Sequence, residues 1–369
     1  MEVNESIFDF EYSFDYYAFL EEVYAFDTPP EVTVSLGVLF MFLIIAGNLW
    51  VIIAVFRQPK LRNTATNIFI VSLSVSDLLI AVVVVPFHIG AFAYGMETSN
   101  KAVCNITAYL HWAAQCGTTF SLLCIGVDRY RAIVQPLRPK LTLQHAAIGC
   151  ILVWVCALGY SCGKFATVGI VSENNTIYIE KGNETIIAHS MYHFCYVTDF
   201  EIDKILRICD FLVMYVIPLA IITTLYSIMV YTLWFSKAPT NSGNRNKRKA
   251  VKMLSFVVLQ FAITWLPSNV LQLYYAWTVD FPMEPFLWSI APSNLCVFII
   301  LCNSWINPIL YAYFNESFRK EFRKLFPCFY KCKRSKVSAE DSSMTGYYAT
   351  NTARAGGRTR VSMINSTVA

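Results

Sequence analysis

Charged residues are scarce in this chain of 369 residues, of which they make up 15%. A soluble domain carries about 25% charged residues. The scarcity is also uneven: residues 32–56, 102–127, 141–163, 211–236, 253–279 and 285–315 hold no formal charge, and residues 63–96 hold only Asp77. Each run is long enough to cross ~30 Å of hydrocarbon as a helix. The sequence therefore predicts an all-α membrane protein, a bundle of seven transmembrane helices.

Several other patterns are missing. None of the runs alternates with period two, which excludes a membrane β-barrel. No nucleophile with a nearby base and no metal-ligand spacing is present, which makes an enzyme the least favoured class. Residues 1–31 lack the basic and apolar regions of a cleavable signal peptide. We therefore expect the first span to serve as the signal anchor.

Basic residues are absent from residues 1–31, which hold nine acidic ones. With this end outside, extracellular segments contain 18 of the 25 acidic residues but only 5 of the 29 basic residues. Lys and Arg favour the cytoplasmic side of membrane proteins. The charge pattern thus predicts a multi-pass protein of the plasma membrane with an extracellular N-terminus.

Four regions follow from this topology. Residues 1–31 form a disordered acidic extracellular tail, and residues 32–315 form the seven-helix bundle. Residues 316–327 place phenylalanines at i, i+4 spacing among basic residues, which predicts a short amphipathic eighth helix on the membrane surface. Residues 328–369 form a disordered cytoplasmic tail. The sequence predicts glycosylation at Asn4, Asn174 and Asn183 and palmitoylation at Cys328 and Cys332.

Ionisable residues stand at two positions where a membrane helix rarely tolerates them. Asp77 lies near the middle of the second span, where a charge costs a few kcal/mol, about 3 on insertion scales. It should therefore face a polar cavity or a partner. Asp128, Arg129 and Tyr130 follow the third span directly, at the membrane edge. An ion pair there suggests a function beyond packing.

These residues belong to a set of motifs in all seven spans, in order. They are Asn48 in Gly-Asn-x-x-Val, Asp77, Asp128-Arg129-Tyr130, Trp154, Pro218 with Tyr226, Trp265-Leu266-Pro267, and Asn307-Pro308-Ile309-Leu310-Tyr311. From Gly47 to Cys332 the chain resembles a rhodopsin-like (class A) G-protein-coupled receptor.

The resemblance implies a role for each motif. Cys104 would be joined by a disulfide to Cys195 in the second extracellular loop, and Asp128 would restrain Arg129 at rest. On activation Arg129 would swing toward the sixth helix and a heterotrimeric G protein. The remaining switch residues would be Tyr130, Tyr226, Trp265, Pro267, Asn307, Pro308 and Tyr311. Arrestin, receptor kinases and membrane lipids would be further partners, and no nucleic acid is implied.

The resemblance also implies a sodium site in the resting state. Its ligands would be Asp77, Asn48, Thr118, Asn303 and Asn307. A buried carboxylate with amide and hydroxyl partners is a plausible site for a small cation. The alternative is a hydrated polar network without an ion. No other cofactor is implied.

The kind of ligand is indicated partly by what is absent. His111 stands where amine receptors carry aspartate, and Leu301 stands where opsins carry the lysine that binds retinal. The chain looks most similar to neuropeptide receptors of the RFamide, neuropeptide Y, orexin and cholecystokinin group, and closest to the pyroglutamylated-RFamide type. The residues that suggest this are 66–73, 76–80, 248–254 and 315–318.

Extracellular carboxylates would attract a basic or amidated peptide. They are Glu97, Glu173, Glu184, Asp199, Glu201, Asp203, Asp280 and Glu284. Below them, the predicted pocket comprises His111, Gln115, Trp265, Asn269 and Gln272.

Three alternatives remain open. The first is an orphan or scavenging receptor with weak coupling, which the intact Asp128-Arg129-Tyr130 triplet disfavours. The second is a receptor for a non-peptide ligand. The third is a transporter or channel, which the odd number of spans and the single mid-membrane carboxylate disfavour.

Overall fold

The structure, a computed structural model, describes residues 30–94, 100–181, 184–235, 242–278 and 284–325. It divides into two compact units, Met1–Phe318 and Arg319–Ala369, and the helical bundle lies in the first. Asn4, Asn183, Cys328 and Cys332 lie outside the described residues, and so does the side chain of Asn174. The predicted glycosylation and palmitoylation sites therefore stay predictions.

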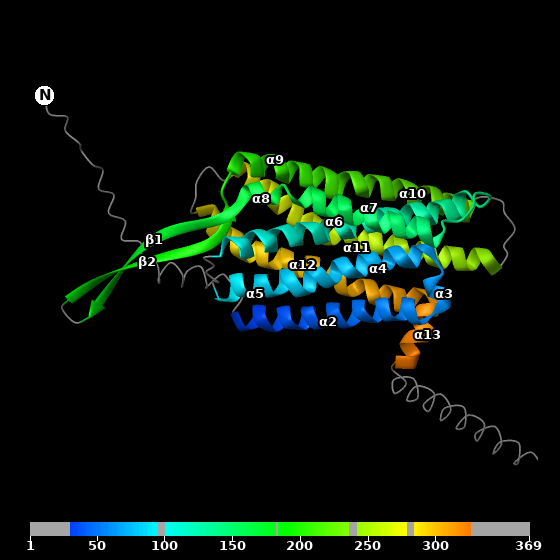
Figure 1. The fold of residues 1–369 in the computed structure, drawn as a ribbon, viewed down its shortest axis with the longest axis horizontal. Helices are drawn as coiled ribbons and strands as arrows, with labels where there is room; N and C mark the ends of the chain where they lie inside the picture. Colours follow the sequence, from blue (N-terminus) through cyan, green and yellow to red (C-terminus); the bar gives the residue numbers. More distant parts are fainter. Residues whose placement is uncertain (1–29, 95–99, 182–183, 236–241, 279–283, 326–369) are drawn as a thin grey trace, which may run out of the picture. The chain divides into compact units, whose positions relative to one another are not determined.

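Long helices form the bundle, as the charge-free runs predict (Figure 1). The first, third and fourth are α2 (Pro30–Arg57), α6 (Lys101–Val134) and α7 (Leu143–Ser161). The second is continuous through α4 (Ala65–Leu79), η1 (Ile80–Val84) and α5 (Val85–Tyr94). The fifth comprises α9 (Phe200–Asp210), η2 (Phe211–Val216) and α10 (Ile217–Phe235). The sixth and seventh are α11 (Ser242–Thr278) and α12 (Glu284–Phe314).

Three short helices complete the helical part of the described chain. They are α3 (Pro59–Arg62), α8 (Lys164–Thr167) and α13 (Glu316–Leu325). The last corresponds to the predicted eighth helix and is described as far as Leu325. Its residue Phe318 is fully buried, with its ring centroid 5.9 Å from those of Trp50 and Tyr311.

Six of the described helical segments are long and apolar enough to cross a membrane. The third helix of the bundle, α6, is not among these six. It lies against α4, α7 and α10 within the bundle. Its central residues include Gln115, Thr118 and Thr119, which are all buried. A helix surrounded by other helices can carry such polar side chains because they meet protein groups instead of lipid.

Two helices contain a π-helical segment immediately before a proline. Segment η1 ends two residues before Pro86, and η2 ends two residues before Pro218. Proline lacks an N–H, and its ring collides with the carbonyl of residue i−4 in a regular α-helix. A wider π-turn relieves that collision and leaves the helix unbroken.

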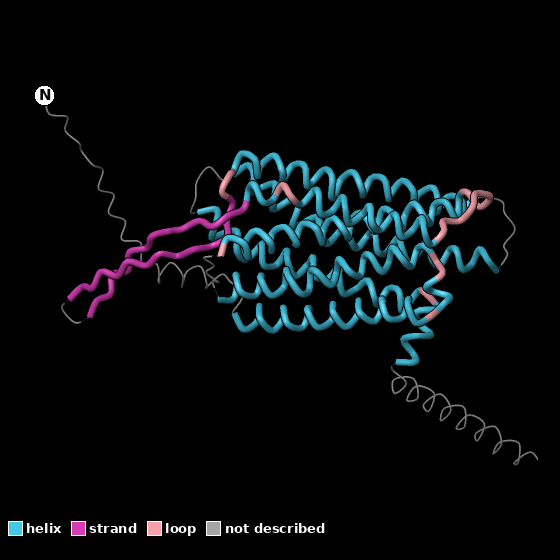
Figure 2. Tube along the Cα trace, viewed as in Figure 1, coloured by secondary structure: helices cyan, strands magenta, loops and turns pink. Residues whose placement is uncertain are grey.

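A long β-hairpin follows α8, where the sequence predicts only a loop. Strands β1 (Val168–Lys181) and β2 (Glu184–Val197) are antiparallel, with Val168 opposite Val197 and Lys181 opposite Glu184. The hairpin extends beyond the end of the bundle at which α8 and α9 lie (Figures 1 and 2). It therefore projects from the end of the bundle at which α8 and α9 lie.

Candidate functional site

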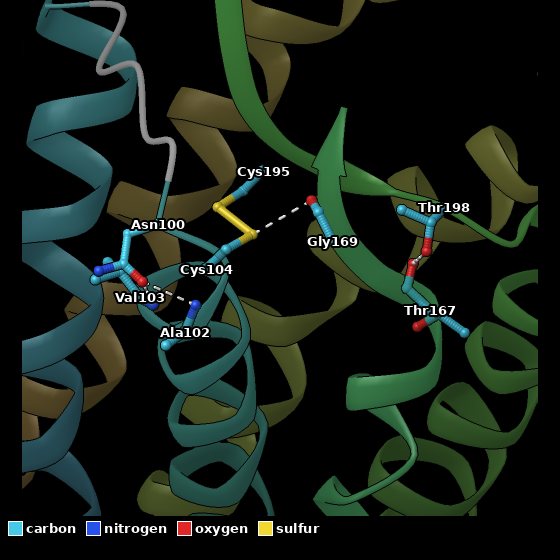
Figure 3. Close-up of a disulfide and its surroundings, with 8 residues drawn as sticks. All are labelled: Asn100, Ala102, Val103, Cys104, Thr167, Gly169, Cys195 and Thr198. Atoms are coloured by element: carbon cyan, nitrogen blue, oxygen red, sulfur yellow. Dashed lines mark hydrogen bonds between the residues drawn. A yellow bond between two sulfur atoms is a disulfide. The ribbon is translucent and has the colours of Figure 1, made fainter. Parts of the chain in front are cut away.

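A disulfide tethers the hairpin to the outer end of α6. Cys104 is joined to Cys195, the pairing that the resemblance implies, with their Cα atoms 5.5 Å apart (Figure 3). Asn100 caps this end of α6: its side-chain Oδ1 accepts hydrogen bonds from the backbone N–H groups of Ala102 and Val103 at 3.0 and 3.3 Å. Such a cap satisfies N–H groups that would otherwise lack partners. The start of α6 and strand β2 are thus held together.

Below this tether, a cavity of about 230 Å³ opens between η1, α6, α9, α11 and α12. Three of the five residues predicted to form the ligand pocket line it: His111, Trp265 and Gln272. The other lining residues are Ile80, Val84, Arg207, Ser268, Leu271, Ser293, Cys296, Val297, Ile300 and Leu301. The cavity is therefore mainly apolar, with a few polar groups, as is usual for ligand sites.

The other two predicted pocket residues, Gln115 and Asn269, are buried but do not line this cavity. The side-chain Nδ2 of Asn269 donates to the backbone oxygen of Trp265 at 2.8 Å. Asn269 thus stabilises the helix turn that carries Trp265. A residue spacing can place a side chain on the inner face of a helix, but it does not say whether the side chain reaches a cavity or its own backbone.

Arg207 is the charged residue among the lining residues that were not predicted from the sequence. The charge-free run of the fifth span begins only at Phe211, because charged residues interrupt the apolar sequence before it. In the structure the helix begins 11 residues earlier as α9, and Asp199 caps it by accepting from the N–H of Ile202 at 3.0 Å. The i, i+4 spacing of Asp203 and Arg207, typical of a helical ion pair, is the signal that could have revealed it.

The predicted rim of carboxylates is only partly described. Asp199 caps α9, Glu201 lies 3.6 Å from the Nζ of Lys204, and Asp203 pairs with Arg207. The other five carboxylate side chains lie outside the described residues. All three described carboxylates therefore have local structural partners on α9.

Trp265 connects this cavity to a column of aromatic rings within the bundle. Its ring centroid lies 6.2 Å from that of Phe261, which lies 6.1 Å from the ring of Tyr215. The hydroxyl of Tyr215 donates to the backbone oxygen of Ala262 at 2.8 Å and ties η2 to α11. Pro267 lies within α11 two residues after Trp265. A change at the cavity floor would thus reach the point where α11 can bend.

The residues predicted to bind sodium form a polar region between α2, α4, α6 and α12. Asn48 donates to the backbone oxygen of Ser304 at 3.1 Å, and the Nδ2 of Asn307 lies 3.4 Å from the Oδ2 of Asp77. Asn303 accepts from Gln260 Nε2 through its backbone oxygen at 2.9 Å. Helices α4 and α6 also approach closely here, because a Cβ on Gly117, next to Thr118, would lie 2.5 Å from Ser76 Oγ.

Four oxygen atoms in this region fit a small cation. Asn48 Oδ1, Asp77 Oδ1, Thr118 Oγ1 and Asn307 Oδ1 are buried and have no hydrogen-bond partner among the described residues. A buried carboxylate, amide oxygens and a hydroxyl are the ligand types that hard cations prefer. When bound, a sodium ion would supply positive charge beside Asp77. Asn303, the fifth predicted ligand, already accepts from Gln260.

At the inner end of α6, Arg129 is paired with its neighbour Asp128. The guanidinium Nη2 lies 2.8 Å from Asp128 Oδ2, and the hydroxyl of Thr66 on α4 donates to the same oxygen. Asp128 is buried, and Arg129 is partly exposed at the inner surface. This is the arrangement that the resemblance implies for a resting receptor.

A second cavity, of about 160 Å³, lies beside Arg129 and is lined by residues of α4, α11 and the chain around α13. Tyr226 and Tyr311 are buried nearby in the main apolar core, against which Tyr130 packs. Tyr226 faces α6, since a Cβ on Gly126 would lie 3.7 Å from its ring. Pro308 similarly faces α2, because a Cβ on Gly47 would lie 2.9 Å from its Cγ. Of the predicted switch residues, Trp265 thus lines the outer cavity and Arg129 lines the inner one.

Comparison with known proteins identifies the family. Residues 47–311 match the model of the 7 transmembrane receptor (rhodopsin family). The chain belongs to this family.

Relatives with recorded names support the same conclusion. The receptor is 28% identical to galanin receptor 2b of Danio rerio over 91% of its own length and 85% of the relative's. It is 29% identical to neuropeptide FF receptor 1 of Rattus norvegicus, over 78% and 68% of the two chains. It is 29% identical to a QRFP-like peptide receptor of Branchiostoma floridae, over 80% and 78%.

The predicted class is therefore confirmed. The chain is a multi-pass membrane protein and a G-protein-coupled receptor, not an enzyme. The QRFP-like and neuropeptide FF receptors support the RFamide group predicted from the sequence, while the galanin receptor lies outside the receptors that the sequence analysis named.

Proposed function

We propose that this receptor lies in the plasma membrane with its N-terminus outside and is activated by an extracellular neuropeptide. Residues of five helical segments line its outer cavity, and Trp265 belongs both to that cavity and to the aromatic column of α11. This double position of Trp265 is the observation that carries the proposal. The peptide ligands named for the relatives favour a peptide over a small amine.

In the proposed mechanism, the peptide binds an active conformation better than the resting one and shifts their equilibrium. A ligand in the cavity contacts Trp265, and the resulting change in α11 opens the inner side of the bundle. Arg129 then leaves Asp128 and meets the G protein. The Asp128 pair and the Thr66 hydrogen bond oppose this step in the resting receptor.

The remaining expectations belong to the same proposal. Sodium bound at Asp77 and its neighbours would stabilise the resting state. Receptor kinases and arrestin would act on the cytoplasmic tail. Glycans at Asn4, Asn174 and Asn183 would lie outside, and palmitates at Cys328 and Cys332 would contact inner membrane lipids.

A peptide screen tests the central part. Cells expressing the receptor are exposed to a library of synthetic neuropeptides, amidated and non-amidated, with calcium and cAMP as readouts. We expect at least one peptide to give a response that the Arg129→Ala variant lacks at equal surface expression. Silence across the library from a receptor that reaches the surface would count against peptide activation and favour a scavenging role. A response unchanged by Arg129→Ala would contradict the role of the ion pair.

A further inference from the structure

Two of the side chains that line the outer cavity can donate hydrogen bonds but cannot accept them. Among the described lining residues no carboxylate appears, and Arg207 carries the one formal charge, with His111 taken as neutral. The side-chain amide of Gln272 already donates to Ser268 Oγ at 3.2 Å. His111, Ser268, Gln272 and Ser293 can donate or accept, so Arg207 and Trp265 are the lining residues whose polar groups can only donate.

Arg207 is held in position by a carboxylate on its own helix. Its Nε donates to Asp203 Oδ2, one turn earlier in α9, and the Asp203 side chain is nearly buried. The Arg207 side chain keeps 22% of its surface exposed. A guanidinium carries five N–H donors in a rigid fork. With Nε occupied, the two terminal Nη groups have no hydrogen-bond partner among the described residues, and they form an edge that matches a carboxylate.

Trp265 provides the second donor. Its side chain is 2% exposed, and its indole Nε1 has no hydrogen-bond partner among the described residues. Leaving a buried donor unpaired is costly, so such groups usually have an acceptor when the site is occupied. The indole N–H can donate but cannot accept. The ligand atom that satisfies it must therefore be an acceptor.

Most of the remaining lining residues are apolar, with Val84, Leu271 and Val297 among them. Its volume of about 230 Å³ lies below the ~300 Å³ at which ordinary ligand pockets begin. It can hold the end of a peptide or one large side chain, but not a whole peptide. The group that enters must combine an apolar part with an acceptor.

We propose that the part of the ligand that enters this cavity presents a carboxylate to Arg207, and that Asp203 is a positioning residue for that arginine. The carboxylate is a peptide C-terminus or an acidic side chain next to an apolar group. This inference deepens the proposed peptide function and rests on it. It also differs from the basic or amidated ligand predicted from the sequence, because the free edge of Arg207 needs an acceptor and a ligand guanidinium or ammonium has none.

Fragment binding tests the inference without an identified peptide. The purified full-length receptor in lipid nanodiscs is titrated with N-acetyl-phenylalanine, its neutral carboxamide and phenethylguanidine, with saturation-transfer NMR as the readout. Charge-assisted hydrogen bonds are stronger than neutral ones by a margin that corresponds to about tenfold in affinity or more. We expect the carboxylate to bind about tenfold tighter than the carboxamide, and the guanidinium fragment to bind least. Equal binding of the two acyl fragments, or preferred binding of the guanidinium fragment, would overturn the inference.

Variants locate the effect. Arg207→Gln should remove the preference for the carboxylate, and Asp203→Asn should reduce it severalfold while Arg207 is retained. Lys204→Gln is the matched control, because it removes a cation from the same helix at a position that does not line the cavity and pairs with Glu201. A preference that survives Arg207→Gln, or that Lys204→Gln removes equally, would contradict the assignment. If Arg207→Gln does not fold, the comparison of the three fragments on the wild-type receptor decides whether the cavity prefers a carboxylate.

The result is separable from the proposed function. A receptor that no library peptide activates can still prefer the carboxylate fragment, which would keep the cavity assignment while removing peptide activation. A receptor that peptides activate but that shows no preference among fragments would keep the function and remove the assignment.

Discussion

A buried ion pair joins α8 and α9 near the outer cavity. Lys164 Nζ lies 2.7 Å from Asp210 Oδ2, and the two side chains are only 5% and 3% exposed. The hydroxyl of Tyr160 donates to the other carboxylate oxygen at 2.9 Å, and the ammonium lies 3.9 Å from the centroid of the Trp112 ring. Each charge therefore depends on the other for compensation.

Neutralising one partner should be much more damaging than neutralising both. Removing one member of a buried pair costs about 3–5 kcal/mol, because the other charge stays buried without compensation. Asp210→Asn keeps an oxygen that can accept from Tyr160 but leaves the ammonium of Lys164 uncompensated. The double variant Lys164→Met/Asp210→Asn removes both charges and keeps that hydrogen bond. We expect its free energy of unfolding to lie within about 1 kcal/mol of wild type, apart from the lost cation–π contact of similar size.

The assay is a double-mutant cycle. The free energy of unfolding is measured by denaturant titration of the purified receptor for the wild type, both single variants and the double variant. We expect the double variant to recover most of the stability lost in Asp210→Asn, which corresponds to a coupling energy of several kcal/mol. Single and double variants that lose equal stability, or single variants that lose less than about 1 kcal/mol, would refute the reasoning, since an exposed pair behaves that way.

Three further predictions concern other parts of the bundle. Thr66→Val removes one hydrogen bond to Asp128 and should raise ligand-independent G-protein activation roughly three- to tenfold, in line with about 1 kcal/mol per bond. Asp77→Asn should abolish the effect of sodium on agonist affinity, measured by exchanging sodium for choline. Gly117→Ala should lower surface expression and thermal stability by overpacking, at a cost of about 1–3 kcal/mol, because its Cβ would lie 2.5 Å from a hydroxyl oxygen of α4. Gly159→Ala should leave surface expression and thermal stability unchanged, because nothing lies within 4 Å of the added Cβ.

Each of these has a result that would count against it. Unchanged basal activity in both Thr66→Val and Asp128→Asn, at matched surface expression, would remove the proposed restraint. A sodium effect of equal size in Asp77→Asn would place the ion elsewhere. Equal stability of the two glycine variants would mean that α4 yields without cost at its contact with Gly117.

The sequence predicted the helices of the bundle well, because the requirement that the membrane places on a helix can be read directly from the chain. Long charge-free runs are required wherever a helix meets lipid, and these runs located all seven spans. The cost of burying Asp77 predicted a polar partner for that carboxylate, and the family resemblance supplied the residues expected around it. In the structure Asn307 lies 3.4 Å from Asp77, and Asn48 donates to the backbone oxygen of Ser304 on the same helix as Asn307.

The outer side was predicted less well, for physical reasons. Segment α9 continues the fifth helix beyond the apolar run, and its charges pair with one another one turn apart, so the lack of apolar character did not end the helix. The β-hairpin is stabilised by backbone pairing between segments, which no period in the sequence reveals. Both α9 and the hairpin lie outside the charge-free runs that guided the prediction. Arg207 was missed because it belongs to α9.

The most direct test of the account is nucleotide exchange on a purified heterotrimeric G protein, catalysed by the receptor in nanodiscs with a peptide found in the screen. We predict that the peptide accelerates exchange on the wild type, and that Arg129→Ala binds the same peptide but does not accelerate exchange. Exchange that the peptide does not accelerate, or that proceeds equally with Arg129→Ala, would contradict the central claim that the outer cavity controls the Asp128–Arg129 pair.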